Sequence, residues 1–445
     1  MNHKKYRQFV RPLVLVLLLF AFVAAASAQW KESVLYSFQG GSTGLSHPIG
    51  RIVLDRDGNL YGATQVGPGQ GSVYELVLPA KLGDPWTETI LYTFQGKPVN
   101  DGQIPSGGLL IDKQGNLYGV TGYGGIGGCI LLGVLSGCGA VYELSPPASK
   151  GGEWTETILY SFQGGTDGDF PFGDLTRDEN GNLYGATQYG GGYGTCNTYF
   201  GYCGTIFKLT PPQMPGGTWT EQLLYSFKGG NDGANPNGGL VFDAKGNIYG
   251  TTSWGGSTTA CVYTGFVGCG TVFRLNPSSS GTWTEDVLHR FQGRPSDGSG
   301  PNGNLILRAG ALLGTTIGGG GNEDGVIFEL APTGRNGNSW KEIFIHVFDD
   351  GAPLTGLFED SGGTLYGTDS GGQSHGGAVF RLNPPSQRSG KWRLGVLHGF
   401  TGSPDGFDPQ ELMLCGDSTI YGTTEYGGTC TAFEGGCGTV FKMVQ

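Results

Sequence analysis

A four-segment unit recurs seven times along the chain, and this repeat limits what the chain can fold into. In one copy the first two segments are residues 238–243 and 246–252. The third and fourth segments of the same copy are residues 270–275 and 283–291. Glycine-rich stretches of variable length separate the segments. Constant segments joined by variable loops indicate a repeated supersecondary unit.

Aromatic residues mark the fourth segment in every copy. A tryptophan opens the segment at Trp30, Trp86, Trp154, Trp219, Trp283, Trp340 and Trp392. A phenylalanine closes it at Phe38, Phe94, Phe162, Phe227, Phe291, Phe348 and Phe400. All four segments are short, rich in aromatic and β-branched residues, and bounded by Gly, Pro, Asn or Asp, which predicts strands and turns. Four strands per unit, repeated around an axis, is the β-propeller arrangement.

The two ends of the repeat predict how the ring closes. The first segment after residues 1–28 is a fourth segment, residues 30–38, and the last is a third segment, residues 440–443. The unpaired fourth segment can complete the last blade, which removes exposed edge strands. An open solenoid would instead need polar capping units, and none is visible. We therefore expect one all-β domain over residues 29–445, a seven-bladed β-propeller with four strands per blade whose last blade is closed by the N-terminal strand.

Residues 1–28 have the features of a signal peptide, with a basic start, an apolar run at residues 13–23 and an Ala-Ser-Ala cleavage signal. No later apolar stretch is long enough to span a bilayer. We therefore expect a secreted or periplasmic monomer with no membrane span after cleavage. The net charge of −11, which becomes more negative when residues 1–28 are removed, argues against nucleic acid or anionic lipid as a partner.

Eight of the nine cysteines form short-range pairs, each between a second and a third segment. The pairs are Cys129 with Cys138, Cys196 with Cys203, Cys261 with Cys269, and Cys430 with Cys437. In an exported protein this spacing predicts four disulfides, each closing one loop. Cys415 is left over, and we expect it to be a buried free thiol.

The repeat resembles the GloVer tandem-repeat family of exported bacterial proteins. The resemblance covers residues 30–443 and rests on three phrases. They are the "LYSF" step at residues 35–38, 91–94, 159–162 and 224–227, the "GNLYG" step at residues 58–62, and the "GTVF" step at residues 438–441. The resemblance implies a repeat type and no particular reaction. Members often carry a C-terminal surface anchor, and no such anchor precedes Gln445, so we expect a released or periplasmic protein.

Acidic residues recur at two turns of nearly every unit. Those of the first-to-second turn, among them Asp55 and Asp243, are placed to cap that turn. Those of a "DG…P" loop are Asp101, Asp167, Asp232, Asp297, Asp350 and Asp405. They fit turn chemistry, and a ring of oxygen ligands for calcium is the open alternative. His289, His346 and His398 replace a tyrosine in three different units, so we do not expect them to act together in catalysis. We also expect no cofactor, no metal site and no other catalytic residues.

The function we expect is non-catalytic binding of an extracellular polysaccharide or surface protein. The second-to-third and fourth-to-first loops are long and emerge on one face, where a rigid scaffold can present them. Aromatic residues in two of these loops can stack on sugar rings or bury area against a protein. The candidate ligand-binding residues are Tyr199, Phe200, Tyr202, Trp254, Tyr263 and Phe266. The alternative is a hydrolase or lyase acting on polysaccharide at the central channel, which a non-repeating cluster of His, Glu, Asp or Arg there would favour.

Overall fold

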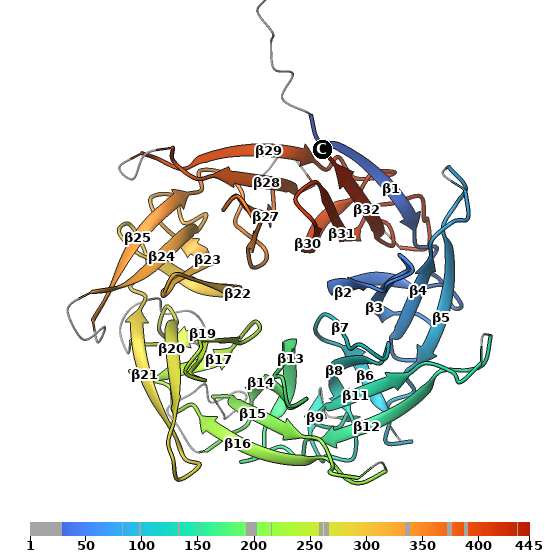
Figure 1. Cartoon of the computed structure of the whole chain (residues 1–445), viewed down its shortest axis with the longest axis horizontal. Helices are drawn as coiled ribbons and strands as arrows, with labels where there is room; N and C mark the ends of the chain where they lie inside the picture. The colour runs from blue at the N-terminus through green and yellow to red at the C-terminus, as the bar shows by residue number, and fades with distance from the viewer. Residues whose placement is uncertain are drawn as a thin grey trace, which may run out of the picture.

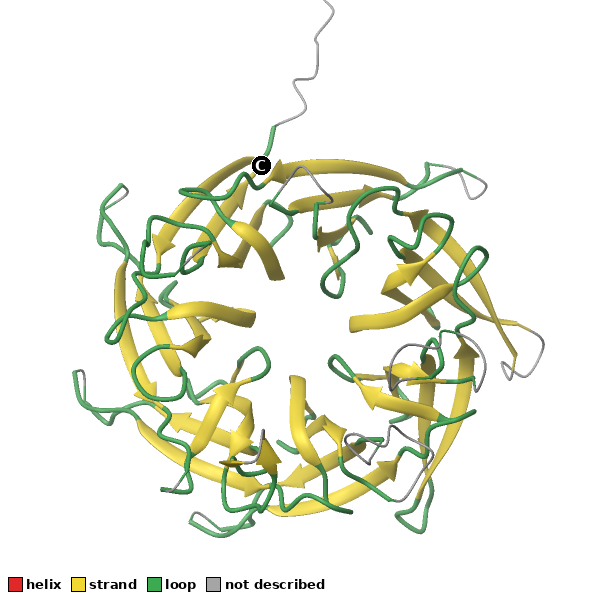
Figure 2. Ribbon diagram, turned by 180° about the vertical axis from the view of Figure 1, so that it is seen from behind, coloured by secondary structure: helices red, strands yellow, loops and turns green. Residues whose placement is uncertain are grey.

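The computed structural model shows a closed ring of antiparallel sheets arranged around a central axis (Figure 1). It describes residues 29–445 apart from residues 82, 98, 132–133, 150, 193–202, 215, 258–260, 262–266, 334–338, 372–375, 387–389 and 434. The predicted signal peptide, residues 1–28, lies outside this part of the chain. Strands and loops make up the whole described chain, as Figure 2 shows from behind. No helix that could cross a bilayer occurs among the described residues.

Blades 1 to 4 follow one another along the chain, and in each blade the strands run in order from the ring centre outwards. Blade 1 comprises β2 (Ser46–Leu54), β3 (Leu60–Val66), β4 (Ser72–Val77) and β5 (Thr87–Thr93). Blade 2 comprises β6 (Gly102–Pro105) with β7 (Leu110–Ile111), then β8 (Leu117–Gly124), β11 (Ala140–Ser145) and β12 (Thr155–Ser161). Blade 3 comprises β13 (Asp169–Arg177), β14 (Leu183–Tyr189), β15 (Thr205–Thr210) and β16 (Thr220–Ser226). Blade 4 comprises β17 (Gly233–Pro236) with β18 (Val241–Phe242), then β19 (Ile248–Gly255), β20 (Thr271–Pro277) and β21 (Trp283–Arg290).

Blades 5 to 7 complete the ring. Blade 5 comprises β22 (Gly298–Arg308), β23 (Ala311–Gly319), β24 (Val326–Thr333) and β25 (Ser339–Val347). Blade 6 comprises β26 (Phe358–Glu359), β27 (Leu365–Asp369), β28 (Ala378–Asn383) and β29 (Arg393–Gly399). Blade 7 comprises β30 (Phe407–Cys415), β31 (Thr419–Tyr426), β32 (Thr439–Val444) and, outermost, β1 (Lys31–Ser37). A short hairpin of β9 (Ile130–Leu131) and β10 (Val134–Leu135) lies in a loop of blade 2.

The N-terminal strand closes the ring as predicted. β1 pairs with β32 in antiparallel register from Lys31 opposite Val444 to Ser37 opposite Thr439. Figure 1 shows the C-terminus beside β1, so the first and last strands belong to one blade. The predicted seven-bladed β-propeller is therefore confirmed.

The core lies between neighbouring blades, where the repeated phenylalanine meets an aromatic ring of the next blade. Phe38 at the end of β1, for example, packs edge-to-face on Tyr74 of blade 1, with ring centres 5.1 Å apart. The same contact joins the other junctions through Phe94–Tyr142, Phe162–Phe207, Phe227–Phe273, Phe291–Phe328, Phe348–Phe380 and Phe400–Phe441. The Tyr-Gly step follows from this packing, because a Cβ on Gly62 would lie 2.3 Å from the Tyr74 hydroxyl oxygen.

The acidic residues of the first-to-second turns cap those turns, as expected. Asp55 accepts hydrogen bonds from the backbone nitrogens of Asp57 and Asn59 at 2.9 and 2.8 Å. Its second oxygen accepts from the Tyr61 hydroxyl at 3.0 Å. The "DG…P" carboxylates are likewise engaged in turns, since Asp101 accepts from the backbone nitrogens of Gln95 and Gly102. Turn chemistry accounts for both acidic positions.

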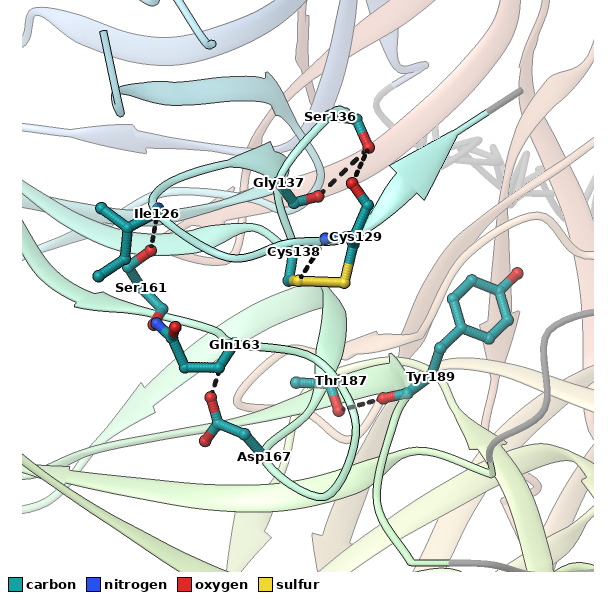
Figure 3. The surroundings of a disulfide bond; sticks show 10 residues. All are labelled: Ile126, Cys129, Ser136, Gly137, Cys138, Ser161, Gln163, Asp167, Thr187 and Tyr189. Atoms are coloured by element: carbon teal, nitrogen blue, oxygen red, sulfur yellow. Dashed lines mark hydrogen bonds between the residues drawn. A yellow bond between two sulfur atoms is a disulfide. The ribbon is translucent and has the colours of Figure 1, made fainter. Parts of the chain in front are cut away.

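Disulfides close loops between second and third strands. Figure 3 shows the bond between Cys129 and Cys138 in blade 2. Equivalent bonds join Cys261 to Cys269 and Cys430 to Cys437. Cys203 is also disulfide-bonded, and its expected partner Cys196 lies outside the described residues.

Cys415 corrects one expectation. It is a free thiol, as predicted, but it is exposed rather than buried. The reason is its place at the end of β30, where the chain enters the first-to-second turn and the side chain meets solvent.

Candidate functional site

The innermost strands bring one residue from each blade to the ring centre. Each of the four continuous innermost strands shifts register near its middle, for example between Ile49 and Val53 in β2. Such a bulge re-aims the residues within it. The residues placed there, in blade order, are Arg51, Gly108, Asp174, Gly239, Asn304, Gly356 and Glu411.

Large polar residues and glycines alternate at this position from blade 1 to blade 7. The glycines leave room for their neighbours, because a Cβ on Gly108 would lie 2.5 Å from an oxygen of Asp174. A Cβ on Gly239 would lie equally close, 2.5 Å, to the side-chain oxygen of Asn304. Asp174 and Asn304 therefore need these two glycines in order to reach the ring centre.

The four side chains form one hydrogen-bonded network, which we call the channel cluster: Arg51, Asp174, Asn304 and Glu411. Arg51 Nη2 lies 3.3 Å from Asp174 Oδ2. Asn304 Nδ2 donates to Asp174 Oδ2 at 3.2 Å and to Glu411 Oε1 at 3.1 Å. The backbone nitrogen of Gly108 donates to Asp174 Oδ1 at 2.9 Å. Residues far apart in sequence thus share one site that breaks the ring's symmetry.

The Glu411 carboxyl group of the channel cluster lies next to a second carboxyl group, that of Asp174. Burial raises the pKa of Glu411 to about 8, the nearby Asp174 carboxylate raises it further, and Arg51 opposes the shift. Asp174 in turn raises the pKa of the Arg51 guanidinium. The raised pKa of Glu411 favours its protonated form at neutral pH, which is the form that a general acid requires.

The space beside the channel cluster is small. It is a cavity of about 140 Å³, and residues from all seven blades line it, including Ser106, Phe172, Asn237, Thr355 and Gln410. Ligand pockets usually measure roughly 300–1,000 Å³. This cavity holds a few water molecules or one small group, and a sugar chain does not fit in it.

Aromatic rings gather on a different part of the molecule, the face that carries the second-to-third and fourth-to-first loops, which we call the loop face. Backbone bonds tie these loops to the next blade: His47 donates to the carbonyl of Cys437, and Phe170 to that of Cys138, both at 3.1 Å. An aromatic residue lies at or next to the end of the second strand in four blades, at Tyr123, Tyr189, Trp254 and Tyr426. These positions are equivalent, since each pairs with the start of its own innermost strand, as Trp254 does with Ala234 and Tyr426 with Phe407.

An aromatic pocket on the loop face lies in blade 7, and we call it the blade 7 pocket. It measures about 610 Å³ and is lined by Gly402, Ser403, Phe407, Tyr426, Cys430, Thr431, Phe433, Gly435 and Gly436. Phe407 and Phe433 are 44% and 37% exposed. The His47 ring of blade 1 packs edge-on against Tyr426 and Phe433, at 5.1 and 5.4 Å between ring centres. The disulfide between Cys430 and Cys437 holds the loop that carries Phe433.

A second aromatic group lies between blades 2 and 3 on the same face. Phe170 contacts Tyr123, Phe172 and Tyr189, with ring centres 4.9, 6.1 and 5.8 Å apart. Burial raises the pKa of the adjacent Asp169 to about 6. These four rings are half-buried against one another, so little of their surface is free to contact a ligand.

Most of the predicted ligand-binding residues lie outside the described part of the chain: Tyr199, Phe200, Tyr202, Tyr263 and Phe266. Trp254 is described, and it is half-buried against the core between blades 3 and 4. These six residues remain a prediction. The repeat does not indicate the blade 7 pocket, because no aromatic residue recurs at the position of Phe407 at the start of β30, and Phe433 lies in a loop of variable sequence. The disulfide spacing around Phe433 marked that loop.

Comparisons with known proteins identify a family. The model of the Gloeobacter/Verrucomicrobia repeat matches residues 20–262 and 193–441. No curated protein sequence matches this chain.

Solved structures with a similar fold differ widely in what they do. An aldose sugar dehydrogenase from Streptomyces coelicolor with bound PQQ is 13% identical, covers 94% of this chain and 98% of its own, and has a TM-score of 0.42. A putative 6-phosphogluconolactonase from Bacteroides uniformis is 15% identical, and the match covers 82% of this chain and 88% of that protein with a TM-score of 0.48. An endo-arabinase from Bacteroides thetaiotaomicron is 14% identical, covers 71% and 99%, and has a TM-score of 0.33. Likenesses this distant say nothing about the activity of this chain.

Proposed function

Since the chain belongs to the Gloeobacter/Verrucomicrobia repeat family and its repeats build a ring with one loop-bearing face, we propose that it is an exported, non-catalytic propeller that binds extracellular polysaccharide on that face. The observation that carries the proposal is the blade 7 pocket. Its three rings, from Phe407, Tyr426 and Phe433, surround an open space wide enough for sugar units. Aromatic faces stack on the apolar faces of sugars, and neighbouring hydroxyl and backbone groups can bond their polar edges.

Two features support binding without large rearrangement. The loop carrying Phe433 is closed by a disulfide and bonded through Cys437 to the next blade. A ligand that meets pre-ordered rings loses little free energy to ordering them.

Disulfides are typical of proteins in oxidising compartments, which supports secretion or a periplasmic location.

A glycan array of the purified protein tests this proposal. We expect binding to one class of polysaccharide and, for Phe433→Ala, affinity about 5- to 30-fold weaker, the usual cost of truncating a central aromatic contact. Ile343→Ala is the matched control, because this residue is 48% exposed on β25 at the rim, away from the loop face. Binding to a surface protein but to no glycan, or equal loss in both variants, would contradict the proposal.

A second candidate function is cleavage of polysaccharide at the central channel, by hydrolysis or elimination. The observation that favours it is the symmetry-breaking pair in the channel cluster, in which Glu411 holds a proton beside Asp174. Against it stand the small cavity and the hydrogen bonds that already engage both carboxyl groups. Release of reducing or unsaturated ends from any bound glycan, abolished in Glu411→Gln, would support this candidate over non-catalytic binding.

A further inference from the structure

An acidic pair recurs at the junctions between blades, near the ring's outer edge. One member is the "DG…P" aspartate, and the other is a glutamate two residues after the tryptophan of the next outer strand. In the junction between blades 3 and 4 the pair is Asp232 and Glu285, and the Tyr225 hydroxyl donates to Asp232 at 3.0 Å. A tyrosine fills this third place at most junctions and can only bond the acids through its hydroxyl.

In two junctions a histidine replaces the tyrosine and brings a nitrogen ligand to the acidic pair. His289 Nε2 lies 3.2 Å from Asp297 Oδ1 and 3.9 Å from Glu342 Oε2. His398 Nε2 lies 3.2 Å from each oxygen of Asp405. In both groups the nitrogen and two carboxylate oxygens, the second from Glu342 or Glu32, lie within 4.8 Å of one another.

These separations match those of ligands that share a metal ion. Bonds of about 2.0–2.1 Å in a tetrahedral site place the ligand atoms roughly 3.3 Å apart, so small side-chain shifts would bring all three atoms into range. Backbone nitrogens of Gln292 and Gly298 already donate to Asp297 at 2.8 and 2.7 Å and hold it in place.

Each group also has spare bonding capacity and an opening to solvent. Glu32 Oε1 and Glu342 Oε1 are buried oxygens without a hydrogen-bond partner. The side chains of His289 and His398 are 20% and 25% exposed, so an ion can reach the imidazole from solvent. Water can complete the coordination on that side.

We propose that the chain binds two divalent transition-metal ions, one at His289, Asp297 and Glu342 and one at Glu32, His398 and Asp405. One imidazole and two carboxylates suit Zn²⁺, Co²⁺ or Ni²⁺, whereas Ca²⁺ prefers oxygen ligands alone. Two carboxylates and a neutral imidazole also balance the charge of a divalent ion. The sites are distinct from the blade 7 pocket and from the channel cluster.

The second site has a structural consequence. Glu32 lies on the closing strand β1, His398 on β29 of blade 6, and Asp405 on the link into blade 7. An ion held there ties the N-terminal strand to the preceding blade. Because the ion would bind the folded ring and not the unfolded chain, its binding raises stability.

The chain contains its own control for this proposal. His346 occupies the same position in blade 5, but Leu394 stands where the next outer strand would supply the glutamate. The third histidine therefore lacks the second carboxylate, and it should bind no metal. The tyrosine junctions show which substitution the fold accepts at this position.

Calorimetric titration of tag-free, chelator-treated protein with Zn²⁺ tests the proposal, with the Co²⁺ absorption spectrum as a second readout. We expect two ions per chain for the wild type and for His346→Tyr. We expect one ion for His289→Tyr or His398→Tyr and none for the double variant. Tyrosine is native at this place in other blades, so these variants should fold, and Glu342→Leu, which copies the blade 6 residue, should also bind one ion.

Melting with and without Zn²⁺ completes the test. A metal-dependent rise in melting temperature that shrinks in His398→Tyr and not in His346→Tyr supports the site on the closing strand. Absence of Zn²⁺ binding by the wild type, or unchanged stoichiometry in the double variant, overturns the proposal.

Discussion

At the scale of single residues, small side chains decide where large ones can meet. Gly108 and Gly239 leave space at the ring centre for Asp174 and Asn304, and Gly62 does the same for Tyr74 between blades. The sequence marks Gly62 as a repeated position, because the Tyr-Gly step recurs in most units. The sequence does not reveal the role of Gly108 and Gly239, because glycine stands at the channel position in only three of the seven blades. Their role also depends on side chains more than 50 positions away in the chain.

The protonation of Glu411 gives a prediction about pH. Burial raises its pKa to about 8 in the folded chain, so the folded state holds a proton that the unfolded state releases above its ordinary pKa, about 4.5. The free energy of unfolding should therefore fall between about pH 5 and pH 8. Glu411→Gln cannot ionise, and we expect it to gain about 1 kcal/mol or more on the wild type across this window, since one pKa unit is worth about 1.4 kcal/mol.

Denaturant unfolding at pH 5 and pH 8.5 measures this difference. Glu153→Gln is the control, because Glu153 is exposed and lies outside the channel. Parallel pH profiles for Glu411→Gln and the wild type would show that the channel does not hold the proton.

The number of free thiols gives a second prediction at the scale of single residues. Cys415 is free and exposed, so a thiol reagent should modify one cysteine per chain in the native protein. Denaturation without reduction should reveal no further thiol if Cys196 pairs with Cys203. Two additional thiols would contradict that pairing, and Cys415→Ser should remove the native reaction.

At the scale of elements, the closing strand and the bulged inner strands have different structural roles. β1 covers the edge of β32 and completes the blade on which the blade 7 pocket is built. The inner strands set the channel cluster through their register shifts. The repeat spacing predicts the pairing of β1 with β32, because the unpaired fourth segment at the start of the repeat can complete only the last blade. It does not predict a bulge, which depends on local backbone angles.

Removing the closing strand should destabilise the ring. Deletion of residues 29–40 exposes the edge of β32 and the apolar surface covered by Trp30 and Phe38, both buried. We expect the deletion variant to lose most of its stability and to associate through the open edge. Melting and sedimentation of the variant measure both effects, and a monomer that melts like the wild type would contradict the closure account.

At the scale of the whole molecule, symmetry separates scaffold from site. The elements that repeat, among them the interblade aromatic pairs and the capped turns, build the ring. The sequence pattern predicted the strands, the closure and the capped turns, and the structure added the aromatic pairing across blades. The features that break the repeat, the channel cluster and the blade 7 pocket, carry the candidate chemistry. Only the folded ring shows that Arg51, Asp174, Asn304 and Glu411 meet, or that Phe407, Tyr426 and Phe433 share one opening.

The measurement that tests the central claim most directly compares these two places in one binding assay. Affinity for the polysaccharide selected by the array would be measured for the wild type, Tyr426→Ala and Glu411→Gln, each shown to melt within a few degrees of the wild type. The loop-face account predicts binding at least about fivefold weaker for Tyr426→Ala and unchanged for Glu411→Gln. Unchanged binding by Tyr426→Ala, together with loss of binding or turnover in Glu411→Gln, would contradict it and place the function in the channel.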